Sequence, residues 1–100
     1  YPEAVIAVND LTAVGVIKSI ERHGLKIPED IAVVGYDNID IDEIIDPNIT
    51  TIDYNFEVFG ETLVSTAIAG IESQAVMEQK NIEPHIIVRA SSNIKRNGKK

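Results

Sequence analysis

The sequence has no cysteine and no tryptophan, and aromatic residues make up only 5% of it. The lack of cysteine excludes a disulfide scaffold, a zinc site built on thiolates and a cysteine nucleophile. The formal net charge of −7 argues against a direct, non-specific grip on nucleic acid. No apolar run approaches the ~20 residues of a membrane span. What is present is a globular chain of 100 residues, 44% of them hydrophobic, which is one domain or part of one.

The two ends of the sequence do not look like parts of a folded core. The chain begins at Tyr1 rather than at a methionine or a charged leader region, so we expect a piece of a longer protein without a signal peptide. Residues 93–100 are basic and have no apolar periodicity. This tail is expected to be solvated and disordered.

Two short apolar runs, at residues 4–8 and 31–34, have no polar alternation. Such runs are typical of strands covered on both faces in a parallel sheet. An apolar repeat of three to four predicts a helix over residues 11–23, with Gly24 suited to its C-terminal end. Either Asn9 or Asp10 could cap its N-terminus. The order strand, helix, strand predicts a right-handed βαβ unit.

Polar residues follow both predicted strands, with Asn9 after the first and Asp37 after the second. Ligands of open α/β sheets bind at the carboxyl ends of the strands. A carboxylate at Asp37 could accept two hydrogen bonds from sugar hydroxyls or ring N–H donors. The alternative is that Asp37 only caps the turn that follows it.

The second half of the sequence alternates between polar loops and short apolar elements. Apolar residues spaced three and four apart predict a helix from Phe56 to about Gly70, and Ile44 and Ile45 are apolar where no long element hides them. The remaining expectations are an acidic loop at 38–46 with one helical turn at 41–45, extended chain at 49–52, a polar loop at 73–84 with a possible turn at 75–79, and a strand at 86–88.

Enzymatic and metal chemistry find little support. The acidic residues of the loop lack the glycine and the ligand spacing of a calcium loop, so a solvated loop is favoured over a metal site. A phosphoacceptor domain could use Asp10 and Asp37, but the sequence has no Lys-Pro pair after a later strand. No G-x-S-x-G or phosphate-binding glycine motif occurs. We therefore expect no metal, no cofactor and no enzymatic activity.

Several short motifs occur in a fixed order through residues 2–92. They include Asn9-Asp10-x-x-Ala13-x-Gly15, Gly35-Tyr36-Asp37-Asn38, Thr50-Thr51-Ile52 and Ile87-x-Arg89-x-Ser91. Each motif is weak alone, but the ordered set resembles the effector-sensing domain of the lactose-repressor (LacI/GalR) family of bacterial transcription regulators.

The resemblance implies a three-layer α/β fold with a doubly wound parallel sheet, similar to a type I periplasmic binding protein, of which this chain would be a fragment. Residues 1–92 would form the C-terminal portion of the effector-binding domain. Within it, residues 1–53 would belong to the C-terminal subdomain, 54–84 would cross to the N-terminal subdomain, and 85–92 would be the return strand.

The resemblance also implies two functional surfaces. Residues at the positions of Asn9 and Asp37 commonly face the effector, and Tyr54 and Phe56 would line the cleft. The dimer surface would include Val14, Ile17, Ile44 and Ile45. The apolar face of the helix from Phe56 would pack on the absent N-terminal subdomain, so we expect the isolated chain not to be a stable monomer.

The function implied is allosteric sensing in a cytoplasmic, homodimeric repressor that has no membrane contact. A small effector, sugar-like in chemistry, would shift the equilibrium between two states of the cleft. DNA would be bound only through a headpiece that this chain does not contain. The alternative is a segment of a periplasmic sugar-binding protein of a transporter.

Overall fold

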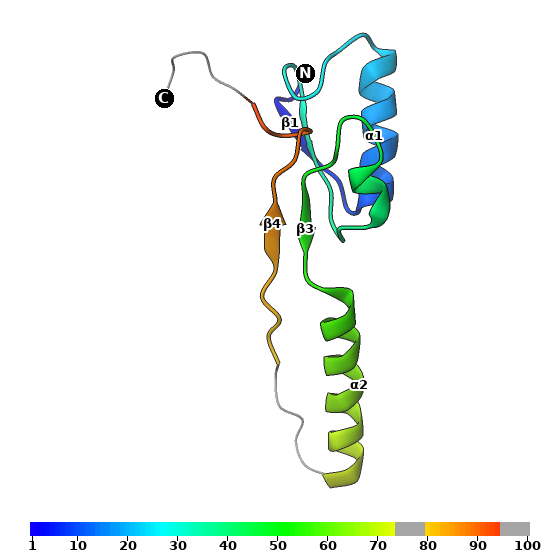
Figure 1. Cartoon of the computed structure of the whole chain (residues 1–100), viewed down its shortest axis with the longest axis vertical. Coiled ribbons are helices and arrows are strands. Elements are labelled where there is room, and N and C mark those ends of the chain that lie inside the picture. Colours follow the sequence, from blue (N-terminus) through cyan, green and yellow to red (C-terminus); the bar gives the residue numbers. More distant parts are fainter. Residues whose placement is uncertain (74–79, 95–100) are drawn as a thin grey trace. The chain divides into compact units, whose positions relative to one another are not determined.

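The computed structural model describes residues 1–73 and 80–94, and the chain divides into two compact units (Figure 1). Unit 1 consists of Tyr1–Asp53 together with the segment that starts at Ile86, and unit 2 is Tyr54–His85. No helix in the described ranges is long and apolar enough to cross a membrane.

Unit 1 begins with the predicted βαβ arrangement. Strand β1 (Ala4–Ile6) leads into helix α1 (Asp10–Arg22), and strand β2 (Ala32–Val34) follows. The two strands are parallel, with Ala4 opposite Ala32 and Ile6 opposite Val34. The helix therefore serves as the crossover between neighbouring parallel strands, as the sequence predicts.

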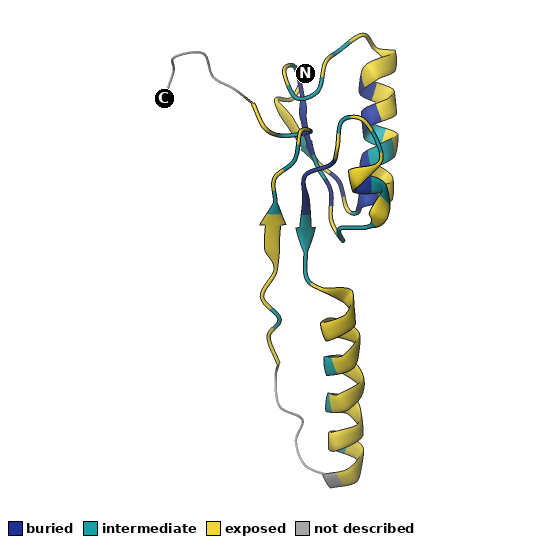
Figure 2. Cartoon of the chain, viewed as in Figure 1, coloured by how far each residue is buried: buried dark blue, intermediate teal, exposed yellow. Residues whose placement is uncertain are grey.

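The core of unit 1 lies between α1 and the strands. Ile17 of α1, Val33 of β2 and Ile49 have no exposed surface. Figure 2 shows the buried residues gathered in this unit. The prediction of burial on both faces holds for β2, all of whose residues are buried or half-buried, but it is wrong for β1. Ile6 remains 77% exposed because no described element covers the outer face of that strand.

Further extended segments continue the strand pairing of unit 1. Val34 forms an isolated parallel bridge with Thr50, directly before strand β3 (Thr51–Asp53). Strand β3 pairs with β4 (His85–Ile87), which starts one residue before the predicted 86–88. The acidic loop contains the short 3-10 helix η1 (Asp40–Glu43), close to the single helical turn expected at 41–45.

Unit 2 contains helix α2 (Phe56–Ser73), which extends three residues beyond the predicted end at Gly70. Its apolar side chains are largely exposed, including Leu63 at 57% and Ile71 at 76% (Figure 2). The ring of Tyr54 packs edge-on against Phe56 and Phe59, with centroids 5.1 and 5.3 Å away. The turn expected at 75–79 and most of the predicted basic tail lie outside the described residues.

Candidate functional site

Asn9 and Asp37 follow the carboxyl ends of two adjacent parallel strands. The chain continues from β1 through Asn9 into α1, and from β2 through Gly35 to Asp37. The backbone N–H of Asp10 donates to the carbonyl oxygen of Tyr36 at 2.9 Å, which joins the two segments directly. This arrangement confirms the prediction that both residues lie at the same edge of the sheet.

Asn9 has a structural role at this edge. Its Oδ1 accepts a hydrogen bond from the backbone N–H of Thr12 at 2.8 Å, so Asn9 is the N-cap of α1. This settles the open choice between Asn9 and Asp10 in favour of Asn9. The side chain remains partly exposed, and its amide N–H groups are separate from the oxygen that caps the helix.

Asp37 and Asn38 adopt unusual backbone conformations. Their φ angles are +117° and +60°, in a region that residues other than glycine rarely occupy. Such conformations cluster at ligand sites and persist where the surroundings hold them in place. Here the N–H of Asp37 donates to Ile52 at 3.0 Å, and that of Asn38 donates to the Thr51 hydroxyl at 3.1 Å.

Asp10 is fully buried and holds three segments of the edge together. Its carboxylate accepts hydrogen bonds from the Thr51 hydroxyl at 2.8 Å and from the backbone N–H of Ile39 at 3.0 Å. The negative charge also lies in the first turn of α1, where the helix dipole favours it. The sequence offered Asp10 as a helix cap or a phosphoacceptor, and neither expectation included this buried bracing of the loop.

Asp42 of η1 is a buried acid whose carboxyl oxygens accept no hydrogen bond from the described residues. Burial, the neighbouring carboxylate of Asp10 and the charge of Asp37 together raise its pKa to about 8, although the Arg89 guanidinium acts in the opposite direction. Asp42 therefore carries a proton at neutral pH. A solvated acidic loop was expected here, and buried Asp42 corrects that expectation. Asp40 and Glu43 of the same turn are exposed, whereas Asp42 lies against Asp10 and Arg89.

Arg89 reaches this cluster from the segment after β4. Its Nη2 donates to Oδ1 of Asn38 at 3.0 Å, and its Nη1 donates to the carbonyl oxygen of Ile49 at 2.9 Å. Nη1 also lies 3.5 Å from a carboxyl oxygen of Asp42. In the sequence, Arg89 was identified only as part of a motif, because no neighbouring residue indicates that it contacts residues some fifty positions earlier.

Among residues 1–73 and 80–94, no three His, Asp or Glu side chains are placed to hold a metal ion. The neighbouring acids Asp10 and Asp42 make contacts within the loop instead. Asp10 accepts a hydrogen bond from Ile39, and Asp42 lies next to the guanidinium of Arg89.

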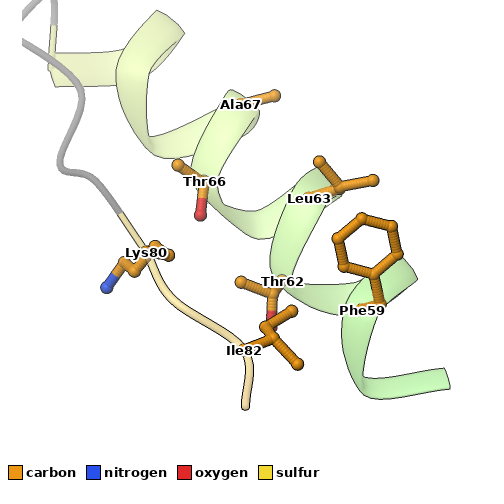
Figure 3. A pocket seen from close by; sticks show the side chains of 7 residues that line it. All are labelled: Phe59, Thr62, Leu63, Thr66, Ala67, Lys80 and Ile82. Carbon is orange, nitrogen blue, oxygen red and sulfur yellow. The ribbon is translucent and has the colours of Figure 1, made fainter. Parts of the chain in front are cut away.

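Tyr54 and Phe56, predicted to line the cleft, belong to unit 2 and contact each other there. The same unit has an apolar pocket of about 390 Å³, formed by α2 and the segment before β4 (Figure 3). Its lining includes Phe59, Leu63 and Ile82 but neither predicted aromatic. The ligand role of Tyr54 and Phe56 stays a prediction.

The residues predicted for the dimer surface differ in exposure. Ile44 is 75% exposed, Val14 and Ile45 are half-buried against the core, and Ile17 is fully enclosed in it. Ile44 is therefore the member of this set with most surface left for a partner, and the role of the whole set stays a prediction.

The sequence matches the family of periplasmic binding protein-like domains over residues 1–92. The chain belongs to this family. It corresponds to the C-terminal part of an effector-binding domain of the LacI/GalR type, in agreement with the resemblance indicated by its motifs.

Curated relatives and solved structures agree on this placement. The chain is 37% identical to the NTD biosynthesis operon regulator NtdR of Bacillus subtilis and 34% identical to the ribose operon repressor of Escherichia coli. Each alignment covers 91% of this chain but 28% of the relative, so the chain spans little more than a quarter of their length.

Two solved structures show the same fold. One is the Lac repressor dimer bound to operator and an anti-inducer, with a TM-score of 0.83 and 31% identity over 91% of this chain and 32% of that one. The other is a LacI-family regulator from Enterococcus faecium with bound ribose, with a TM-score of 0.79 and 34% identity over 90% of this chain and 34% of that one.

Proposed function

We propose that this chain is part of the effector sensor of a bacterial transcriptional repressor, and that Asn9 and Asp37 bind the effector. The observation that carries the proposal is the conformation of Asp37. A carboxylate-bearing residue held at a φ of +117°, at the carboxyl edge of a parallel sheet and beside Asn9, is typical of a ligand site.

The chemistry of the edge favours a polyhydroxylated effector. The carboxylate of Asp37 accepts hydrogen bonds from hydroxyl groups, and the amide of Asn9 has N–H donors that capping leaves available. Similarity to a ribose operon repressor and to a regulator with bound ribose supports a sugar or related metabolite. The relatives are named as regulators, which favours the repressor over the transporter segment and argues against an enzyme.

The mechanism is a shift between two states of the sensor. An effector that binds one state more tightly moves the equilibrium by its difference in affinity, and a DNA-binding region outside this chain would read the result. The repressor would act in the cytoplasm as a homodimer, in which the exposed Ile44 lies at the subunit contact with Val14 and Ile45.

Titration calorimetry with ribose tests the proposal in the whole protein that carries these residues. Asp37→Ala should weaken ribose binding by about 100-fold, the expected cost of losing charged hydrogen bonds in a closed site. Asp40→Ala removes an exposed acid three positions further along the loop and serves as the matched control. Equal affinity of the Asp37→Ala variant and the control would contradict the assignment of the site.

A further inference from the structure

We propose that Arg89 is a positioning residue of the effector edge, which holds the Asp37–Asn38 segment in its binding conformation without touching the effector. The inference rests on the proposed function of that edge. It concerns a residue that follows β4, far from Asp37 in the sequence.

The contacts of Arg89 converge on Asn38. The guanidinium donates to Oδ1 of Asn38 at 3.0 Å, while the backbone N–H of Asn38 donates to Thr51 at 3.1 Å. Asn38 is thereby held from its side chain and from its backbone. Since Asn38 has a φ of +60° and Asp37 precedes it directly, releasing the side chain of Asn38 would leave the peptide that orients Asp37 held only by its own N–H bond to Thr51.

Arg89 is itself held firmly in place. Its backbone N–H donates to Oγ1 of Thr50 at 2.8 Å, and that hydroxyl also bonds to the Arg89 carbonyl oxygen at 3.1 Å. The guanidinium donates to the carbonyl oxygen of Ile49 at 2.9 Å, and 15% of the side chain is exposed. Because the backbone of Arg89 is anchored and its guanidinium is nearly enclosed, Arg89 can hold another residue in position.

The geometry of these contacts suits an arginine better than a lysine. A planar guanidinium can donate from different nitrogens to Asn38 and Ile49 at once, whereas a lysine ammonium is a compact donor on a flexible stem. The same group faces Asp42 at 3.5 Å and Glu43 at 3.9 Å. One cation therefore joins the residue after Asp37 to the acidic turn that follows.

The position of Arg89 in the chain suggests what this contact serves. The chain leaves unit 1 after Asp53 and re-enters it at Ile86, three residues before Arg89. A displacement of the returning strand would reach the side chain of Asn38 through Arg89, in addition to reaching its backbone through the pairing of β4 with β3. Arg89 thus couples the edge to the segment that connects the units.

The test compares Arg89→Met, Arg89→Lys and Arg22→Met in the whole protein. Arg22 is an exposed arginine at the end of α1 and gives a control of the same chemistry. Hydrogen exchange of the amides in residues 37–43 and 13–20 is measured without effector, and ribose affinity is measured by calorimetry. Arg89→Met should speed exchange at 37–43 about 10-fold or more, leave 13–20 unchanged and weaken ribose binding by a similar factor.

Arg89→Lys keeps the charge but not the paired geometry, and should give an intermediate effect on both readouts. Native exchange at 37–43 in Arg89→Met, equal acceleration at 13–20, or unchanged ribose affinity would each overturn the proposal. If Arg89→Met does not fold, wild-type behaviour of Arg89→Lys on both readouts overturns it instead. Loss of ribose binding in Asp37→Ala but not in Arg89→Met would leave the proposed function intact and reject Arg89 alone.

Discussion

The carboxylate of Asp10 occupies the space that a side chain at Gly35 would need. A Cβ built on Gly35 would overlap Oδ1 of Asp10 and lie 3.2 Å from its Cα. The glycine at the end of β2 therefore lets the start of α1 approach, and this approach allows Asp10 to reach Thr51 and Ile39. Close packing of two backbones at this point thus supports the candidate effector edge.

Gly35→Ala should destabilise the protein by about 1–3 kcal/mol, because the buried carboxylate of Asp10 cannot move aside without losing its hydrogen bonds. Gly15→Ala is the control. Gly15 lies within α1 with open space around its Cα, and alanine there should stabilise the helix by about 0.5–1 kcal/mol. Urea unfolding of both variants measures the difference, and a Gly35→Ala variant as stable as wild type would contradict the steric argument.

Asn9 should show separable capping and binding roles. Asn9→Asp keeps an oxygen that can accept from Thr12, so its unfolding free energy should stay within about 0.5 kcal/mol of wild type, whereas Asn9→Ala should lose about 1 kcal/mol. Both variants lack the amide N–H donors and should bind ribose more weakly. Urea unfolding and calorimetry on the same samples test this, and a loss of affinity that follows stability alone would reject a ligand role.

The stability of the protein should fall as the pH rises through the range in which Asp42 titrates. Burial raises the pKa of Asp42 from 3.8 to about 8, so the folded chain binds its proton more tightly than the unfolded chain does. The contribution of Asp42 to the free energy of unfolding is greatest below about pH 4 and decreases as the pH rises to about 8. Asp42→Asn removes the titration and should flatten this decline, making the variant more stable than wild type at pH 9.

Unfolding in urea between pH 4 and 9 measures this effect, and Asp40→Asn, at an exposed position of the same turn, is the control. The Asp42→Asn variant and wild type would have parallel profiles if Asp42 were ionised in the folded protein at neutral pH.

Local signals predicted the framework of unit 1 well. Apolar runs and helical periodicity gave α1 within a residue at each end and placed Asn9 and Asp37 at one edge of a parallel sheet. The same signals missed Asp42 and Arg89. A buried acid such as Asp42 cannot be told from a solvated one when its neighbours in the sequence are also acidic. A contact between distant segments, such as that of Arg89 with Asn38, produces no periodic pattern in either segment.

The extent of burial of β1 and α2 could not be predicted from the sequence either. An unbroken apolar run predicts a strand covered on both faces, but covering requires another element, and no described element covers the outer face of β1. Similarly, α2 was predicted from its repeat of apolar residues, yet the repeat alone does not say what packs against it.

The uncovered apolar surfaces of the chain should drive self-association. Leu63 and Val64 of α2 are 57% and 58% exposed, and Ile44 of unit 1 is 75% exposed. Fully burying one large apolar side chain is worth about 1.5–3 kcal/mol, so the isolated 100-residue chain should self-associate at micromolar concentration. Sedimentation velocity over a dilution series measures this, and a compact monomer throughout would contradict the prediction.

Single substitutions identify the surface responsible. Leu63→Glu places a charge on the larger apolar surface of α2 and should dissociate the isolated chain, whereas Ile44→Glu should leave its association in place. In the whole protein the order should reverse if residues outside this chain cover α2, because Ile44 would then carry the subunit contact. A chain dissociated by Ile44→Glu alone would show that the surface around η1, and not α2, drives association of the isolated chain.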